Sequence, residues 1–158
     1  KSEVDLQGIF FLKDNNTSNN KTFVKHFAED CKSNQVYKGI LNDRSKATYF
    51  SNTHVDQVAQ KTEGYQLSKG ILLSDNASYF SKPELKIYAD DVKCSHGSTI
   101  GPIDENAIFY LRSRGMSKIA ATKILISSFI NEELSSIDNE QMSEIIQKKL
   151  VRYLSKVK

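Results

Sequence analysis

The sequence predicts a parallel β-helix, a solenoid of stacked coils, followed by a small domain of three α-helices. Two observations support this fold class. A tripeptide recurs at a fixed spacing through the first two thirds of the chain, and the spacing of apolar residues changes from strand-like to helical after Gly101-Pro102. We therefore expect a β-helical part at residues 1–101 and a helical domain at residues 102–158.

The repeated tripeptide is glycine, isoleucine and a large apolar residue, and its copies are evenly spaced. They are Gly8-Ile9-Phe10, Gly39-Ile40-Leu41 and Gly70-Ile71-Leu72. A second similarity links Ala47-Thr48-Tyr49-Phe50-Ser51 to Ala77-Ser78-Tyr79-Phe80-Ser81, one residue out of step. Such a period indicates stacked supersecondary units. Because the period is longer than one usual coil, we expect two coils per repeat; the competing interpretation is an antiparallel sandwich.

Short alternating runs in the first part predict strands separated by polar turns. Val4, Leu6 and Gly8 alternate with charged and polar residues, as a strand with two different faces requires. Lys13-Asp14-Asn15-Asn16 is typical of a turn. We expect residues 16–20 to form a protruding loop, and the aromatic pairs at 49–50 and 79–80 to stack as core rungs.

Three helices are predicted after the solenoid from their capping residues. Asp104 is a suitable N-cap for the first, and Gly115 a natural stop. Ser117 would cap the second, and Asp138 the third, where Gln141 could complete a capping-box-like pair. The apolar residues of the third helix recur at helical spacing: Met142, Ile145, Ile146, Leu150, Tyr153 and Leu154.

Composition excludes several classes of function. Lysine and arginine number 22 against 19 acids, a net charge of +3, and no basic run is interleaved with aromatics, so neither a polyanion nor nucleic acid is an expected partner. No apolar run reaches the length of a membrane span, and no nucleotide-binding loop is present. Two cysteines favour a reducing, cytoplasmic setting. Because the chain begins at Lys1, we expect a fragment of a longer protein.

The stretch Asp90-Asp91-Val92-Lys93-Cys94-Ser95-His96-Gly97 carries the candidate chemistry. On a strand, Cys94 and His96 would project to one side, and a thiolate with an imidazole can bind zinc, iron or copper(I). They supply only two ligands, with Asp90 a possible third. A cysteine nucleophile activated by the histidine is a weaker alternative. The simplest alternative for Cys94 and His96 is a buried thiol beside a hydrogen-bonded imidazole.

Longer stretches resemble the SufB/SufD family of iron–sulfur cluster assembly proteins. The matching runs are Ala59-Gln60-Lys61-Thr62, residues 70–75, residues 82–97 and residues 109–115, and the Lys-Cys-Ser-His-Gly form resembles the SufD branch. The resemblance implies a right-handed parallel β-helix with a C-terminal helical domain. It also implies a non-catalytic scaffold subunit that pairs with a SufB-like protein through the β-helix, and a homodimer through the β-helix is possible.

The resemblance assigns roles to particular residues. His96, with Cys94 beside it, would form half of an interfacial site for iron or a nascent cluster, completed by the partner chain. The helical domain would dock an ABC-type ATPase, SufC, which binds the ATP; the expected contacts are Tyr110, Leu111, Arg112, Arg114 and Gly115. No cofactor is expected to bind this chain stably by itself. The alternatives are a purely structural solenoid subunit and a β-helical enzyme acting on polysaccharide, for which Asp90-Asp91 is the candidate carboxylate pair.

Overall fold

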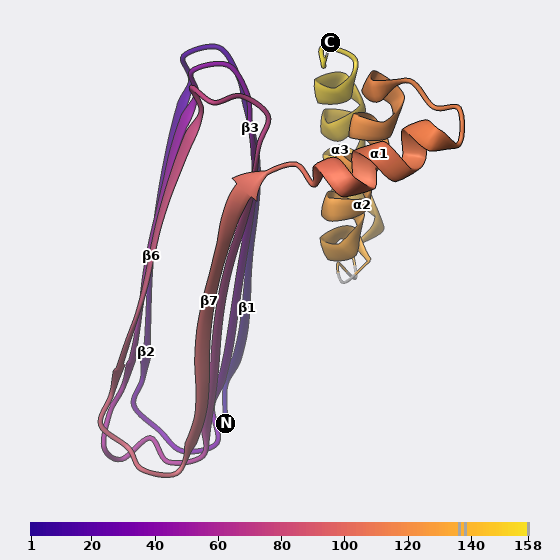
Figure 1. Cartoon of the computed structure of the whole chain (residues 1–158). Helices are drawn as coiled ribbons and strands as arrows, with labels where there is room; N and C mark the ends of the chain where they lie inside the picture. Colours follow the sequence, from indigo (N-terminus) through magenta and orange to yellow (C-terminus); the bar gives the residue numbers. More distant parts are fainter. Residues whose placement is uncertain (136, 138, 158) are drawn as a thin grey trace. The chain divides into compact units, whose positions relative to one another are not determined.

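The computed structural model describes residues 1–135, 137 and 139–157, which form seven strands followed by three helices (Figure 1). The predicted fold class, a parallel β-solenoid with C-terminal helices, is confirmed. The strands are β1 (Glu3–Leu12), β2 (Thr17–His26), β3 (Lys32–Leu41), β4 (Lys46–Val55), β5 (Thr62–Leu72), β6 (Ser78–Ile87) and β7 (Val92–Pro102). The helices are α1 (Glu105–Ser113), α2 (Lys118–Leu134) and α3 (Glu140–Leu154).

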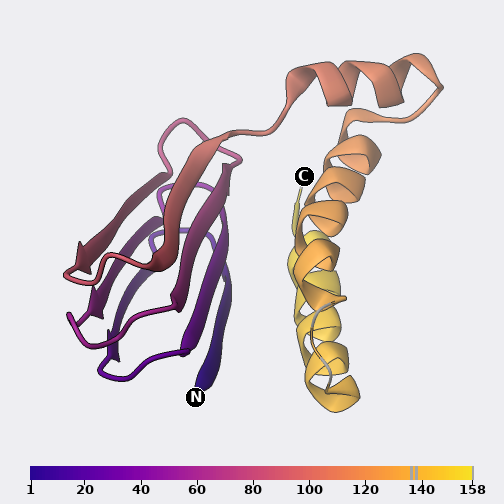
Figure 2. The ribbon, with the colours of Figure 1, turned by 90° about the horizontal axis from the view of Figure 1, so that it is seen from below.

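The strands form two sheets that face each other, one with the order β1-β3-β5-β7 and one with the order β2-β4-β6 (Figure 2). The four pairings with a defined register are all parallel, which excludes the antiparallel sandwich. Each strand pairs with the strand two places further along the chain, so one coil contains two strands. The expectation of two coils per repeat is therefore wrong. The repeat is a single coil, because each of its two strands is 10 or 11 residues long.

The register corrects the alignment of the first repeat. Gly39 pairs with Gly70, as the sequence repeat predicts, but Gly8 pairs with Tyr37 and Phe10 pairs with Gly39. The shift is two residues, so each side chain keeps its face of the sheet. The shift also brings an aromatic ring next to an inward glycine: a Cβ at Gly39 would lie 2.3 Å from the Phe10 ring. The glycines of the tripeptide thus make room for aromatic rings, which come from the neighbouring coil at Gly8 and Gly39 and from the facing sheet at Gly70.

The predicted loop at residues 16–20 is also wrong, because strand β2 begins at Thr17. The turn lies just before it, where Asp14 adopts φ 58° and its backbone N–H donates to the Asp43 side chain of the next coil. Within β2, Asn19 accepts a hydrogen bond from Thr48. Pairing with β4 therefore outweighs the low strand propensity of the asparagines.

The space between the sheets has an apolar part and a polar part. The apolar part contains Leu41, Ala47, Tyr49, Ala77 and Tyr79, which are all buried. The Tyr37 and Tyr49 rings stack with centroids 4.3 Å apart, whereas Phe80, on the opposite face of its strand from Tyr79, is 57% exposed. Tyrosines thus form core rungs as predicted, but the phenylalanines beside them point outward because neighbouring strand residues alternate faces.

The first two helices begin at their predicted caps, and the first ends where predicted. The Asp104 side chain accepts from the backbone N–H groups of Asn106 and Ala107, and Ser117 accepts from Ala120. Gly115 follows α1 with φ 91°, a conformation that favours glycine. Asp138, the expected cap of the third helix, lies outside the described residues, and the Asn139 side chain caps α3 by accepting from Met142.

The chain divides into two compact units, Lys1–Gly101 and Pro102–Lys158. In the helical unit, α2 buries Ala121, Ile126 and Ile130, and α3 buries Leu150 and Tyr153. Part of the predicted stripe on α3 faces solvent, since Met142 and Ile145 are each 49% exposed. Among the described residues, no helix has the length and apolar character needed to cross a membrane.

Candidate functional site

The candidate site lies on β7, the last strand of the solenoid. Cys94 is half-buried and packs beside an apolar cluster of Val55, Ala59 and Ala89. A Cβ added to Gly64 on the preceding coil would lie 3.2 Å from the Cys94 Sγ. Burial raises the pKa of the Cys94 thiol, and a hydrogen bond with the Gly64 backbone partly opposes this rise. The thiol is therefore protonated at neutral pH, and binding a metal would have to displace its proton.

His96 follows Cys94 by two positions on β7, so strand alternation puts both side chains on the same side. This side faces the interior of the solenoid. His96 is nevertheless exposed, because the described strands end with β7 and none stands opposite it in the second sheet. The thiol and the imidazole thus lie on the inner face of an open coil. A partner surface covering this end would contact both of them.

Asp90 does not join the pair. It lies in the corner between β6 and β7, outside the strand, so the alternation that we applied to it fails. Across the described residues, no three His, Cys, Asp or Glu side chains gather in a way that could hold a metal ion. The shortage of ligands that the sequence shows is thus a property of the fold.

The nucleophile alternative loses support from the environment of Cys94. Reactive cysteines have a lowered pKa that maintains the thiolate at neutral pH. Burial has the opposite effect here, because it raises the pKa of Cys94. The adjacent carboxylates Asp90 and Asp91 lie in the exposed corner before β7, and of the two only Asp91 lines the charged cleft there, so the polysaccharide-active alternative lacks a carboxylate pair in a groove.

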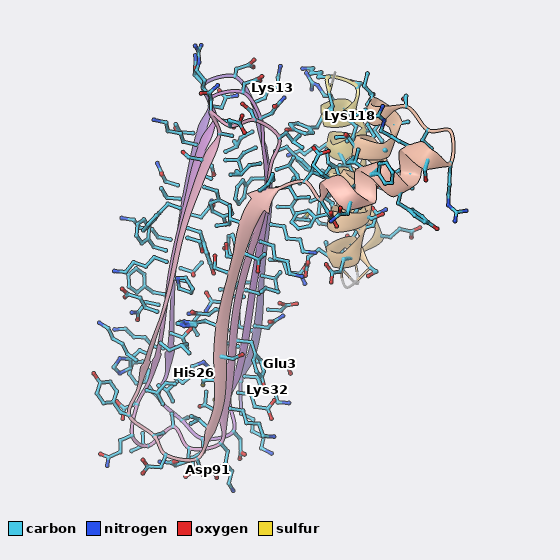
Figure 3. All side chains as sticks on the ribbon, viewed as in Figure 1. Glu3, Lys13, His26, Lys32, Asp91 and Lys118 are labelled. Atoms are coloured by element: carbon cyan, nitrogen blue, oxygen red, sulfur yellow. The ribbon has the colours of Figure 1, made fainter. Side chains whose placement is uncertain are left out.

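The remaining histidines and cysteine occupy structural positions. His26 is buried, with its Nε2 2.9 Å from the Ser33 hydroxyl, and burial lowers its pKa (Figure 3). The Cys31 thiol is buried and donates to the Glu29 carbonyl at 3.5 Å. The His54 ring contacts two exposed aromatic rings. None of the three lies on β7 with Cys94 and His96.

A charged cleft of about 380 Å³, which we did not predict from the sequence, opens at the corner where β7 begins. Glu63 lies 3.3 Å from the Lys32 ammonium and 3.8 Å from that of Lys93, so one carboxylate links three coils. Lys61 and Asp91 also line the cleft (Figure 3 labels Lys32 and Asp91). The signal was present in the sequence: Lys32, Glu63 and Lys93 are about one repeat apart, and stacking brings them together.

The expected ATPase contacts lie on and just after α1. The Tyr110 ring is 56% exposed, and the Arg114 guanidinium stacks 4.5 Å from its centroid. Arg112 is exposed, Leu111 is half-buried, and Gly115 ends the helix. Phe109, which we did not single out as a contact, is 73% exposed. An exposed aromatic pair beside two arginines has the composition of interface hot spots.

Comparison with known proteins identifies similar sequences. A family model described as "SUF system FeS cluster assembly, SufBD core domain" matches residues 1–129. The chain is 36% identical over 143 residues to the iron–sulfur cluster assembly protein SufD of Escherichia coli, covering 90% of this chain. It is 38% identical over 113 residues to the chloroplastic protein ABCI7 of Arabidopsis thaliana, covering 71% of this chain. A SufD protein of Plasmodium falciparum is 30% identical over 152 residues, covering 96%.

The chain spans only a part of each of these relatives. The matched region covers 34% of the Escherichia coli protein, 24% of the Arabidopsis protein and 10% of the Plasmodium protein. The similarity includes both units, because the match to the family model extends beyond the solenoid into α2.

Proposed function

Because the chain belongs to the SufBD core family, with SufD-like relatives, we propose that it serves as a scaffold subunit in iron–sulfur cluster assembly. The observation that carries this proposal is the open inner face of β7, where Cys94 and His96 lie together with no third ligand among the described residues. Iron or a nascent cluster is the cargo of such a subunit. The subunit itself performs no catalysis in this proposal.

The half-site takes its missing ligands from a second chain. A β-helical, SufB-like partner covering the end of the solenoid would contact His96, which is exposed, and Cys94, which is half-buried. His96 is the better ligand of the two, since its imidazole is accessible, whereas the half-buried thiol must first lose its proton. A homodimer through the same end would bring together two copies of this pair.

The helical unit docks a SufC-like ABC ATPase in this proposal. Its exposed aromatic residues on α1 and the arginines beside them are the expected contacts. ATP would be bound by that partner, and dimerisation of the ATPase would strain or open the β-helix interface. Arg112→Glu in the full-length protein should weaken ATPase capture, whereas Lys149→Glu, an exposed charge reversal on α3, should not. Equal capture by both variants would refute docking through α1.

Replacing His96 with alanine in the full-length protein tests the half-site. We expect maturation of cluster-dependent enzymes to be lost in cells that depend on this pathway, while the complex is recovered intact. His54→Ala is the matched control, because His54 is the other histidine outside the core. Normal maturation in His96→Ala would refute the role of His96 as a ligand.

A purely structural role for the motif is the second candidate, and the packing of Cys94 against Val55, Ala59 and Ala89 favours it. In that case the His96→Ala substitution should reduce recovery of the complex and maturation together. The same experiment therefore separates chemistry at the interface from stability of the last coil.

A further inference from the structure

Hydrogen-bonded polar side chains run through the solenoid interior along its axis. The Thr22 hydroxyl donates to Gln35 Oε1 at 2.6 Å, and Gln35 Nε2 donates to Thr53 Oγ1 at 2.9 Å. From the next coil, Gln66 Nε2 also donates to Thr53 Oγ1 at 2.6 Å. Gln35 and Gln66 are register partners on β3 and β5. The series thus rises coil by coil towards the strand that carries His96.

The series ends with one oxygen unpaired. Gln66 is 2% exposed, and its Oε1 is buried without a hydrogen-bond partner. The orientation of the amide is fixed, because Nε2 also donates to the Glu84 carbonyl at 3.3 Å, and a carbonyl can only accept. A flipped amide would place two acceptors against each other. A buried acceptor without a donor is unfavourable and uncommon in folded proteins, so it requires an explanation.

The second sheet supplies no donor to this oxygen. On β4, the inward position next to the two glutamines is Thr53, whose hydroxyl they share. Its register partner on β6 is Leu85, which has no polar group in its side chain. The polar series therefore stops at the third coil on this side, and the next strand in line is β7.

The contacts between β5 and β7 indicate that His96 lies beside Gln66 on the adjacent strand. A Cβ at Gly64 would lie 3.2 Å from Cys94, one at Gly70 would lie 3.3 Å from Ile100, and one at Gly97 would lie 3.4 Å from Leu67. In each of these pairs the β7 residue follows the β5 residue by the same number of sequence positions. His96 follows Gln66 by that same number. Strands paired in a sheet are about 4.8 Å apart, so an inward imidazole is within hydrogen-bond reach of an amide on the adjacent strand.

We propose that Gln66 is a positioning residue, whose Oε1, unpaired in this structure, accepts a hydrogen bond from a ring N–H of His96 when the exposed imidazole turns inward. The contact holds the proton on one nitrogen and leaves the other as a lone-pair donor directed at the open end of the solenoid. Histidines that bind metals typically donate their second ring N–H to such an acceptor, which fixes both the tautomer and the ring orientation. The metal-binding purpose of this contact depends on the function proposed above, but the contact itself does not.

The tautomer of His96 is a direct readout of the contact. Full-length protein with ¹⁵N-labelled histidine would be studied at roughly pH 8.5, above the usual titration range of imidazoles, and His96→Ala would assign the His96 signals. Gln66→Met removes the amide at similar size. Gln35→Met is the matched control, because it removes the register partner one coil below, which makes hydrogen bonds to the same threonine. Gln66→Glu keeps an acceptor oxygen.

We expect the wild type and the Gln35→Met variant to show a single tautomer of His96. In the Gln66→Met variant, the ¹⁵N resonances of the His96 ring should shift towards the average of the values for the two tautomers. Cluster maturation should fall about 10–100-fold in Gln66→Met and recover at least partly in Gln66→Glu. An unchanged tautomer in Gln66→Met, or an equal shift in Gln35→Met, would overturn the proposal. If Gln66→Met does not fold, loss of the single tautomer in Gln66→Glu would overturn it too.

The two proposals fail differently. If His96→Ala leaves maturation normal while Gln66→Met changes the tautomer, the ligand role of His96 is wrong and the Gln66 contact remains. If His96→Ala abolishes maturation while the His96 tautomer is the same in Gln66→Met and in the wild type, the ligand role remains and the contact is wrong.

Discussion

Substitution of Gly70 by alanine tests the reason for the glycine in the repeated tripeptide. The added Cβ would lie 2.5 Å and 3.0 Å from two ring carbons of Tyr79 and 3.3 Å from Ile100. The ring has little freedom to retreat. Tyr79 is 8% exposed, its hydroxyl lies 2.7 Å from that of Ser68, and its ring meets Phe10 edge-on at 5.3 Å.

The magnitude follows from these contacts. Forcing a methyl group into a packed core costs about 1–3 kcal/mol, and displacing Tyr79 from Ser68 costs about 0.5–1.5 kcal/mol more. The lower entropy of the unfolded chain with alanine returns about 0.4–1 kcal/mol. We therefore expect Gly70→Ala to lower the free energy of unfolding by about 2 kcal/mol.

Thermal unfolding followed by circular dichroism would measure this loss in the full-length protein. Gly101→Ala is the control, because a Cβ there would meet nothing within 4 Å, and surface changes of this kind usually fall within about 0.5 kcal/mol. If Gly70→Ala and Gly101→Ala unfold at the same temperature, the glycine does not serve as space for the tyrosine ring, and our account of the repeat is wrong.

Three further predictions concern buried titratable groups and a helix cap. Burial lowers the pKa of His26 from 6.5, so the unfolded state binds the proton more tightly than the folded state. The free energy of unfolding should therefore decrease as the pH falls below about 6.5. The His26→Asn substitution should flatten this dependence in unfolding curves recorded between about pH 5 and 8. Burial raises the pKa of Tyr79 from 10.0 to about 12, so its contribution to stability should be lost as the pH rises between these values, and Tyr79→Phe should remove that alkaline loss. Ser117→Ala should cost the helical unit about 1 kcal/mol, measured by urea unfolding, because the Ala120 N–H loses its acceptor; no change would show that water replaces the cap.

The fold class and the helix ends were predictable because each rests on local chemistry. The glycine tripeptide marked the coil, and Asp104, Gly115 and Ser117 marked the helix boundaries. The number of coils per repeat was not predictable from the repeat alone, since the same period fits one coil of two long strands as well as two coils of two short ones. Strand β2 was missed because parallel pairing with β4, a long-range interaction, decides its conformation.

The site was predictable only in part. Alternation along one strand puts Cys94 and His96 on the same face, because both lie on β7, but it failed for Asp90, which lies outside the strand. Neither the charged cleft around Glu63 nor the unpaired Gln66 oxygen could be predicted without the register, because both arise from residues about one coil apart. Aligning the sequence with itself, coil upon coil, would have brought Lys32, Glu63 and Lys93 together and put Gln66 beside His96.

The corners of the solenoid explain how such a sequence can change length during evolution. The strands are nearly equal in length, while the corners differ, so the sequence separation of register partners varies from pair to pair: Glu3 pairs with Lys32, Lys32 with Glu63, and Lys46 with Ser78. A small insertion or deletion at a corner leaves every inward side chain inward. A single-residue change within a strand would turn the rest of that strand inside out. Alignment gaps between relatives should therefore gather at the corners, and a whole coil is the unit by which the solenoid can grow or shrink without disturbing the inner face that carries His96.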